Sequence, residues 1–470
     1  MGNKLLVRCY NVGCGDCIYV CIPDGNDGFH MLIDCGSKES DSSGILKRAI
    51  QHLEQHELPA VPGGTKKRLD LIVVTHRHED HIKGFDPDYF KNIEIKNIWI
   101  TVAMDKTHPQ AQRSLALHDD VTKAMRDLAS TKTPLSPELA DLVALYGINN
   151  DGATDALTIS LPQKNNITPR FVFAGQTDAD LGVQIPDTKL TILGPERDID
   201  GYYLGKDADD TLRGMTATAA GFRQQSVAVT TACPSNISGS DFRVLQSRLL
   251  SNALAFAVDD SSIQNNVSTV LLIEWAGRRL LFVGDAEWNG VFKQGRKNGS
   301  WNVMWQERRA FLQEPLDFLK VGHHGSHNAT PWNRDADMTH EVNQMLDRLL
   351  PLPPAGEAPT ARCLISTKRK QYDTIPDPEL LVELGRRVSN TRTYLSDFAA
   401  RDPDFDPEQD LFNYSVMKNY SQPPSPREVG EKGWLDQPQP IRTDMESTGK
   451  GSREMPNAVE FVDVEFERAN

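Results

Sequence analysis

The sequence predicts a layered α/β fold, and two observations support this. In the first third of the chain, short apolar runs alternate with a segment of helical period, as they do where sheets are covered by helices. In the second half, apolar strands again end in short polar loops and lead into helices. The 470 residues provide ample apolar side chains for a large core.

The first third of the chain contains most of the expected strands. A helix is expected over Ile45 to Leu53, because Leu46, Ala49 and Ile50 share a face with these end residues. Turn residues separate the apolar runs that we interpret as strands. These strands are Leu5 to Val12, Cys17 to Ile22, Met31 to Cys35, Leu69 to Thr75 and Ile98 to Val102.

The pattern changes after Met104, and we interpret residues 104–260 as a largely helical cap inserted into the core. A strand near Lys189 to Leu193 is expected to belong to the core itself. Because inserted loops carry specificity, the cap is predicted to select the substrate. Its expected helices are one with Leu117, Val121, Ala124 and Leu128 on one face, one from Pro137 to near Gly147, and one from about Asp241 to Ala257.

The core is expected to resume after residue 260 and to give way to a tail at residue 401. Residues 401–470 are rich in Pro, Ser, Asp and Glu, which is typical of a linker, but Val459 to Phe466 alternate as an edge strand would. The predicted segments are therefore 1–103, 104–260, 261–400 and 401–470. The expected elements of the third are strands Val267 to Trp275, Arg278 to Val283, Asp317 to Val321 and Arg362 to Thr367, with helices Trp305 to Leu312 and Pro378 to Arg387.

Composition excludes several classes of function. The net charge of −14 argues against broad neutralisation of a nucleic-acid backbone, and no apolar run approaches the ~20 residues of a membrane span. We expect a soluble, cytoplasmic protein without a membrane partner. Its seven cysteines are expected to be reduced and mostly buried, although the spacing of Cys14 and Cys17 also suits a redox pair or half of a zinc site.

The strongest local signal is Thr-His-Arg-His-Glu-Asp-His, which directly follows an apolar strand at residues 75–81. In a sharp turn, His76 and His78 can point to one position while Asp80 and His81 reach a second one. Imidazole nitrogen and carboxylate oxygen are the ligands that zinc and similar cations prefer. The motif therefore predicts part of a two-metal site.

Two later strands also end in residues that bind metals. Asp285 follows the strand that ends at Val283, where its carboxylate could bridge two cations. His323 and His324 end the next strand. Together with the loop at residues 75–81, these residues are sufficient ligands for two divalent ions, Zn²⁺ or Mn²⁺.

At this point the chain resembles the metallo-β-lactamase-fold hydrolases, and more narrowly the hydrolase domain of the DNA-uptake protein ComEC and its soluble relatives. Six motifs occur in the order and spacing of that group. The resemblance implies a four-layer αββα sandwich. The motifs are Asn11 to Cys17, Leu32 to Gly36, the loop at 75–81, Asn265 to Ser268, Val283 to Asp285 and Leu319 to Ser326.

The resemblance also implies roles for individual residues. His76 and His78 would bind one metal, Asp80 and His81 the other, and Asp285 would bridge them. Either His323 or His324 would complete the second set. Asp34 and Asp16 would orient the metal-binding loop, although both could equally be turn-capping residues.

Two departures from the family pattern stand out. The histidine that many members contribute between the first motif and the bridging aspartate has no clear counterpart, since His108 and His118 fall in the expected cap. The first metal would then be more open, with Asn266 or water near it. Ile375 stands where the ComEC-like pattern often has histidine, so one substrate contact is expected to be missing.

The predicted function is that of a two-metal phosphodiesterase or nuclease, in which a metal-bound hydroxide attacks a phosphodiester of a nucleic acid or a phosphorylated small molecule. Asp80 would share a proton with the attacking water, and His324, Ser326 or His327 would stabilise an oxyanion or protonate the leaving group. His327 could equally be an ordinary loop residue. One alternative is a carboxylic ester, thioester or lactone hydrolase. Another is an effector or scaffold subunit, active only in a complex formed through the cap or tail.

Overall fold

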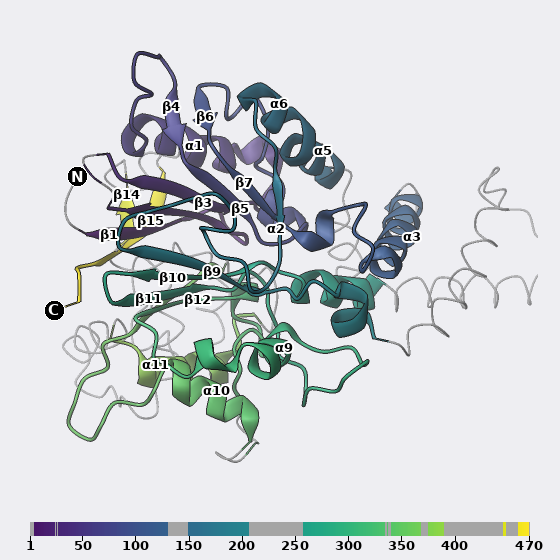
Figure 1. Cartoon of the computed structure of the whole chain (residues 1–470), viewed down its shortest axis with the longest axis vertical. Helices are drawn as coiled ribbons and strands as arrows, with labels where there is room; N and C mark the ends of the chain where they lie inside the picture. Colours follow the sequence, from purple (N-terminus) through teal and green to yellow (C-terminus); the bar gives the residue numbers. More distant parts are fainter. Residues whose placement is uncertain are drawn as a thin grey trace, which may run out of the picture.

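The chain folds as an α/β sandwich in which two β-sheets face each other and helices cover both outer faces (Figure 1). The computed structural model describes residues 4–23, 25, 27–129, 149–205, 257–333, 336, 340–367, 375–389, 445–447 and 459–469. This arrangement agrees with the predicted αββα layers.

The first sheet has eight strands in the order β14-β15-β1-β2-β3-β5-β7-β8. The pairs from β14 to β3 are antiparallel, whereas the pairs from β3 to β8 are parallel. The strands are β1 (Leu5–Tyr10), β2 (Cys17–Ile22), β3 (Phe29–Cys35), β5 (Leu71–Val74), β7 (Ile98–Thr101), β8 (Arg170–Val172), β14 (Met445–Ser447) and β15 (Glu460–Phe466).

The second sheet has five strands in the order β13-β12-β11-β10-β9. Its β11-β10-β9 part is antiparallel, and β12 and β13 continue it in parallel. The strands are β9 (Thr188–Gly194), β10 (Val270–Trp275), β11 (Arg278–Phe282), β12 (Phe318–Val321) and β13 (Arg362–Ile365). A further pair, β4 (Lys67–Leu69) and β6 (Ile93–Ile95), lies outside both sheets.

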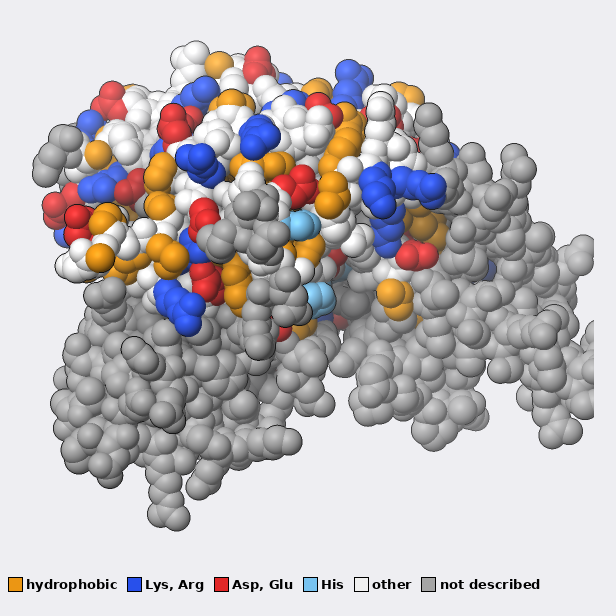
Figure 2. Space-filling model, turned by 90° about the horizontal axis from the view of Figure 1, so that it is seen from below, with side chains coloured by type: hydrophobic (Ala, Val, Ile, Leu, Met, Phe, Trp, Pro, Cys, Tyr) orange, Lys and Arg blue, Asp and Glu red, His pale blue; other side chains and the backbone are white. Residues whose placement is uncertain are grey.

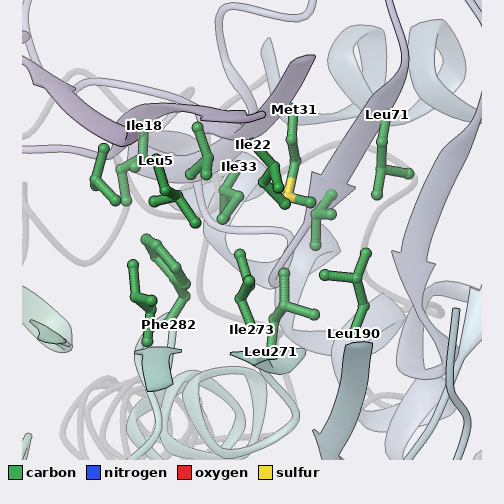
Figure 3. Packing of buried hydrophobic residues seen from close by; sticks show 14 of the residues in the cluster. Leu5, Ile18, Ile22, Met31, Ile33, Leu71, Leu190, Leu271, Ile273 and Phe282 are labelled. Carbon is green, nitrogen blue, oxygen red and sulfur yellow. The ribbon is translucent and has the colours of Figure 1, made fainter. Parts of the chain in front are cut away.

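The core between the sheets is built from strand residues of both. Figure 3 shows Ile33 and Leu71 pointing from the first sheet toward Leu271, Ile273 and Phe282 of the second. All five are at most 1% exposed. Because burial of an apolar side chain stabilises by roughly 1.5–3 kcal/mol, this layer holds the two sheets face to face.

Helices bury one apolar face on each sheet. Over the first sheet, α1 contributes Leu46 and Ile50; over the second, α10 contributes Met345 and Leu346. The helices are α1 (Ile45–His52), α2 (Glu79–Ile82), α3 (Gln112–Ala129), α5 (Asn149–Asp155), α6 (Leu161–Asn165), α9 (Ser300–Glu307), α10 (Glu341–Leu349) and α11 (Pro378–Arg387). Short 3₁₀ or π turns lie at Asp41–Ser43, Leu53–Glu57, Val102–Met104, Ala156–Ser160, Asp200–Leu204, Arg309–Leu312 and His323–Gly325.

Within the described ranges, none of the helices has the length and apolar character needed to cross a bilayer.

Most strands lie where the sequence predicted them, and β2 and α11 have the expected bounds. Helix α9 begins at Ser300 rather than Trp305, because Gly299 ends the preceding loop and Trp301 is already fully buried. The short strands β4, β6 and β8 and the helices α5, α6 and α10 were not predicted. Helix α5 reads Asn-Asn-Asp-Gly-Ala-Thr-Asp, which has almost no apolar periodicity to detect.

The segment at 104–260 contributes to both sheets in its described part. Strand β8 extends the first sheet, and β9, which covers the expected core strand, forms the edge of the second. Helix α3 belongs to a separate apolar cluster that includes Leu117, Val121 and Tyr203. The helices expected over Pro137 to Gly147 and over most of Asp241 to Ala257 lie outside the described residues.

The C-terminal strand β15 is part of the core. It pairs with β1 along its length, and Val462 and Val464 point into the layer between the sheets. Arg8 of β1 donates hydrogen bonds from Nε and Nη2 to the two carboxylate oxygens of Asp463, both at 2.7 Å. The alternation at the end of the tail therefore adds a strand to this chain rather than leaving it for a partner.

We predict that Val464→Ala destabilises the whole domain. Val464 is 5% exposed, and removing two buried methyl groups should lower the free energy of unfolding by about 2 kcal/mol. Urea unfolding followed by circular dichroism measures the change. Glu465→Gln is the control, because its side chain is 54% exposed and surface changes usually have small effects. An unchanged midpoint in Val464→Ala would mean that β15 does not support the core.

Candidate metal centre

The histidine-rich loop lies where β5 ends, at the edge of the sandwich. Thr75 accepts a hydrogen bond from the backbone N–H of Thr269 at 2.9 Å, which joins this loop to the start of β10 in the other sheet. Gly36 lies directly against α2, because a Cβ at that position would approach the Asp80–His81 backbone to 2.1 Å. Only glycine permits this close packing of the strand end against the loop.

One group of ligand atoms consists of His76, His78 and Asp285. Their atoms lie within 4.8 Å of one another, and all three residues are buried. His76 Nε2 is 3.0 Å from His78 Nδ1 and 3.6 Å from Asp285 Oδ2. The sequence places the histidines after β5 and the aspartate after β11, so facing sheet ends bring them together.

A second group lies beside the first and shares Asp285. It contains His81, Asp285 and His324, and His81 Nε2 is 3.1 Å from Asp285 Oδ1. His324 Nε2 is 3.0 Å from Asp80 Oδ2. Asp285 therefore faces both groups, one carboxylate oxygen toward each.

The donor atoms suit divalent cations. Asp80 Oδ1 and His78 Nε2 are buried without a hydrogen-bond partner, which is costly unless another ligand satisfies them. Neutral imidazoles and carboxylates in two adjoining groups are the ligand types of two-metal hydrolase sites. The residues present thus fit two divalent metal ions.

Charges within the cluster balance one another. Burial alone would raise the pKa of Asp285, but the His81 and His76 imidazoles outweigh burial and hold it well below its usual value. Burial likewise would lower the pKa of His81, but Asp285 and Asp34 raise it well above the usual range. The carboxylates therefore demand positive charge at this place, which bound cations would provide.

Asp34 hydrogen-bonds with the first residue of the loop and with His81. Its carboxylate accepts hydrogen bonds from the Thr75 N–H at 2.8 Å and the Thr75 hydroxyl at 2.6 Å, and it lies 2.7 Å from His81 Nδ1. With Nδ1 held in this way, His81 directs Nε2 at Asp285. Asp34 has a φ of 56°, an uncommon conformation for a residue with a side chain.

Asp16 has a different environment. Its carboxylate forms a buried ion pair with Lys320 at 3.0 Å, and its backbone N–H donates to the Asp80 carbonyl at 2.9 Å. The carboxylate also lies in a group with Asp34 and His81. Asp16 thus connects the loop after β1 to α2 and to strand β12.

The structure separates the two adjacent histidines. His324 is 2% exposed and lies inside the cluster, with Nδ1 2.8 Å from the Ser366 carbonyl oxygen. The side chain of His323 is 26% exposed and turns away, where its Nδ1 is 3.0 Å from Glu287 Oε1. Of the two alternatives left open by the sequence, the geometry favours His324 as the ligand.

The other predicted residues lie around this cluster rather than in it. Ser326 is buried and hydrogen-bonds with His323 Nδ1 at 3.1 Å. His327 is exposed on the same loop. Asn266 donates a hydrogen bond to Glu287 Oε2 at 3.1 Å and therefore supports Glu287.

The two cap histidines have other partners. His108 Nε2 is 2.7 Å from the Arg197 carbonyl oxygen, and His118 Nδ1 is 2.8 Å from Asp260 Oδ2. Neither belongs to a ligand group among the described residues. The position of the additional superfamily histidine is thus not filled by either.

Three residues near the site, Lys38, Lys320 and Glu287, were missed by the sequence reasoning, and a fourth, Cys14, was considered only as a partner of Cys17. Lys38 Nζ is 3.2 Å from Asp80 Oδ2, and Lys320 holds Asp16. Glu287 holds His323, and Cys14 lies within 4.8 Å of ligand atoms of Asp80 and His324. All four stand within three residues of a recognised motif, which is the signal that could have identified them.

Figure 2 shows histidine side chains on the face seen from below, with a group of Lys and Arg side chains to their right.

Comparison with known proteins supports a family for the N-terminal part of the chain. Residues 12–87 match the model of the metallo-β-lactamase superfamily. Among solved structures, the chain is similar to the metallo-β-lactamase fold protein YhfI from Bacillus subtilis, with 9% identity, a TM-score of 0.27, and coverage of 72% of this chain and 76% of that one. So low a TM-score adds nothing to the fold assignment. No curated protein matches the chain. The matched segment includes His76, His78, Asp80 and His81, the histidine-rich loop of the candidate metal centre.

Proposed function

We propose that the protein is a two-metal phosphodiesterase that acts on nucleic acid. The observation that carries the proposal is the pair of buried ligand groups that meet at Asp285. The superfamily match supports a metal-dependent hydrolase. The narrower resemblance to the ComEC hydrolase domain supports the phosphodiester as substrate.

His76, His78 and Asp285 would hold one metal, and Asp80, His81, His324 and Asp285 the other. When bound, two such cations supply a water of lowered pKa and neutralise charge on the attacked group. Asp34 fixes the direction of His81, and the Ser366 carbonyl fixes that of His324. These supporting contacts keep the ligands in place before substrate arrives.

Residues at the rim are positioned to contact the substrate. His323 is held by the buried Glu287, which is itself fixed by Asn265 and Asn266. Ser326 lies beside His323. Their polar groups can hydrogen-bond with phosphate oxygens, and the positive charge of Lys38 beside Asp80 adds to the attraction for an anion.

A basic cavity close to the centre favours phosphate over a neutral ester. The cavity has a volume of about 670 Å³ and is lined by Lys293, Arg296 and Lys297 together with Leu204 and Val291. Lys297 pairs with Asp259 at 3.0 Å, in a contact exposed enough for a ligand phosphate to compete with it. Three cations beside two apolar side chains suit the sugar-phosphate chain of a nucleic acid.

The turn that carries these cations is held rigidly. Buried Asn298 accepts a hydrogen bond from the Lys293 N–H at 2.8 Å and donates to the carbonyls of Lys293 at 3.0 Å and Arg296 at 2.7 Å. Its backbone N–H and side chain both donate to the Tyr202 carbonyl at 3.1 Å. Because the backbone is fixed, less ordering entropy opposes binding of an anion.

Chain connectivity places the cavity near the metal centre. Asn289 lines the cavity and follows Asp285 by four residues, which span at most about 14 Å. One strand of nucleic acid could therefore place a phosphate at each position. This local arrangement is compatible with the net negative charge of the whole chain.

We predict two metal ions per chain after saturation with zinc and removal of free metal. The two ligand groups require this number if Asp285 bridges the ions. Inductively coupled plasma mass spectrometry on the purified protein gives the stoichiometry. A stoichiometry of one zinc ion per chain or fewer would contradict the proposed centre.

We predict that Asp285→Ala and Asp80→Ala lose hydrolysis while keeping the fold. Loss of a ligand should remove about 3 kcal/mol or more of barrier stabilisation, which is at least about a hundredfold in kcat/KM. Rates on bis(p-nitrophenyl) phosphate and on single-stranded DNA measure the loss, and circular dichroism checks the fold. The control is Asp88→Ala at an exposed position outside the ligand groups. Activity within tenfold of the parent in either folded ligand variant would refute the mechanism.

We predict that the double variant Lys293→Glu/Arg296→Glu weakens binding of single-stranded DNA by about tenfold or more and flattens its dependence on salt. Fluorescence anisotropy in the presence of a chelator measures binding independently of catalysis. Hydrolysis of bis(p-nitrophenyl) phosphate should stay unchanged, because this small substrate does not reach the cavity.

The charge-matched control is Lys47→Glu/Lys91→Glu, at exposed positions that do not line the cavity. Equal DNA affinity in the two double variants would remove the support that the cavity gives to a nucleic-acid substrate. Turnover of a thioester or lactone without cleavage of any phosphodiester would replace the proposal by the ester-hydrolase alternative.

A further inference from the structure

Cys14 has a position unlike that of the other cysteines. Among the six cysteines that the structure describes, Cys9, Cys17, Cys21, Cys35 and Cys363 belong to the hydrophobic clusters of the core. Cys14 is equally buried, at 1% exposure, but is in none of those clusters. Packing alone therefore accounts for the five others but not for Cys14.

The surroundings of Cys14 are metal-ligand atoms. Its Sγ, one carboxylate oxygen of Asp80 and one ring nitrogen of His324 lie within 4.8 Å of one another. Ligand atoms around a single tetrahedral zinc ion are about 3.5 Å apart, given bonds of about 2.0–2.3 Å. The group thus needs only a small contraction to surround one ion.

A second, independent observation points to a ligand at this position. Asp80 is 2% exposed, and its Oδ1 has no hydrogen-bond partner even though Oδ2 contacts both Lys38 and His324. A buried carboxylate oxygen left unsatisfied is costly. A cation between Asp80, His324 and Cys14 would satisfy it.

The backbone holds Cys14 in place before any ion binds. The Cys14 carbonyl accepts a hydrogen bond from the Lys38 N–H at 2.8 Å, and Asp16 bonds through its backbone to both Gly36 and Asp80, at 2.8 and 2.9 Å. Gly15 fits closely, because a Cβ there would lie 2.4 Å from the Gly36 carbonyl oxygen. The loop that carries the thiol is therefore attached to the strand end and to α2 of the metal centre.

We propose that Cys14 is a thiolate ligand of the second metal, with Asp80, His81 and His324, and that this ligand makes the position selective for zinc over manganese. The inference rests on the proposed metal centre. Thiolate sulphur is a soft ligand that suits zinc, whereas manganese prefers oxygen. Binding displaces the thiol proton to solvent, and the sulphur–metal bond takes its place.

With Cys14 as a ligand, the two metal sites would differ in how many positions the protein fills. Asp80, His81, His324, Cys14 and the bridging Asp285 would give the second ion five protein ligands, so that this site would be closed to solvent water. His76, His78 and Asp285 give the first ion three, which leaves a position open to water or substrate. The second ion then holds α2 and the bridging aspartate in place.

Cobalt(II) titration of the whole chain tests the proposal without relying on activity, because a cobalt–thiolate bond gives an intense near-ultraviolet charge-transfer band. We expect the band in the parent and its loss in Cys14→Ser and Cys14→Ala. Cys21→Ala is the matched control, since Cys21 is buried outside the metal centre, and it should keep the band. Zinc affinity of Cys14→Ser at the second metal site should fall at least about tenfold, whereas manganese affinity stays the same.

X-ray absorption spectroscopy of the zinc-loaded parent detects a zinc–sulphur bond without any substitution, so a variant that fails to fold does not affect this test. Sulphur at about 2.3 Å from zinc supports the proposal. A shell of nitrogen and oxygen only, or a cobalt band that persists in Cys14→Ala, would overturn it. Two bound ions without sulphur would leave the two-metal centre standing, whereas the absence of any bound metal would contradict the centre itself.

Discussion

The need to neutralise buried charge governs the architecture of this site. Asp34, Asp80 and Asp285 are each at most 2% exposed, in a region where an unpaired carboxylate would be severely penalised. Positively charged side chains of the protein neutralise only some of these carboxylates. Lys38 pairs with Asp80 and Lys320 with Asp16, while Asp285 depends on histidines. Bound cations would balance the carboxylates gathered in this way.

The sandwich brings ligands from two different sheets together at one edge. The Thr75–His81 loop belongs to the first sheet, whereas Asp285 and His324 follow strands of the second. Apolar packing between the sheets fixes their ends at one edge, so the ligands need no flexible linker to meet. Gly284, with φ 54°, shows how close this approach is, because a Cβ there would lie 2.7 Å from Cβ of Thr75. A substitution at Gly284 would therefore separate the sheets at the metal centre itself.

The sequence predicted the elements that a run of neighbouring residues is enough to identify. Strand β2 and helix α11 were located by apolar periodicity, and the ligand set of Thr75–His81 was visible in seven consecutive residues. Short elements such as β8 and α5 were not, because three to seven residues of mixed polarity give no period to measure. The choice between His323 and His324 could not be made either. Both have positive φ, and their opposite directions depend on this backbone conformation.

The role of Cys14 was the least visible from the sequence. The spacing of Cys14 and Cys17 suggested a pair, but β2 places Cys17 among the apolar residues of the outer layer, while Cys14 faces the metal centre. The spacing of two residues in the sequence does not determine the direction in which each side chain points from a turn. Here two glycines, Gly13 and Gly15, flank the thiol with positive φ and set its direction. The same loop that resembles a family motif can therefore give this chain a metal preference of its own through a single residue, Cys14.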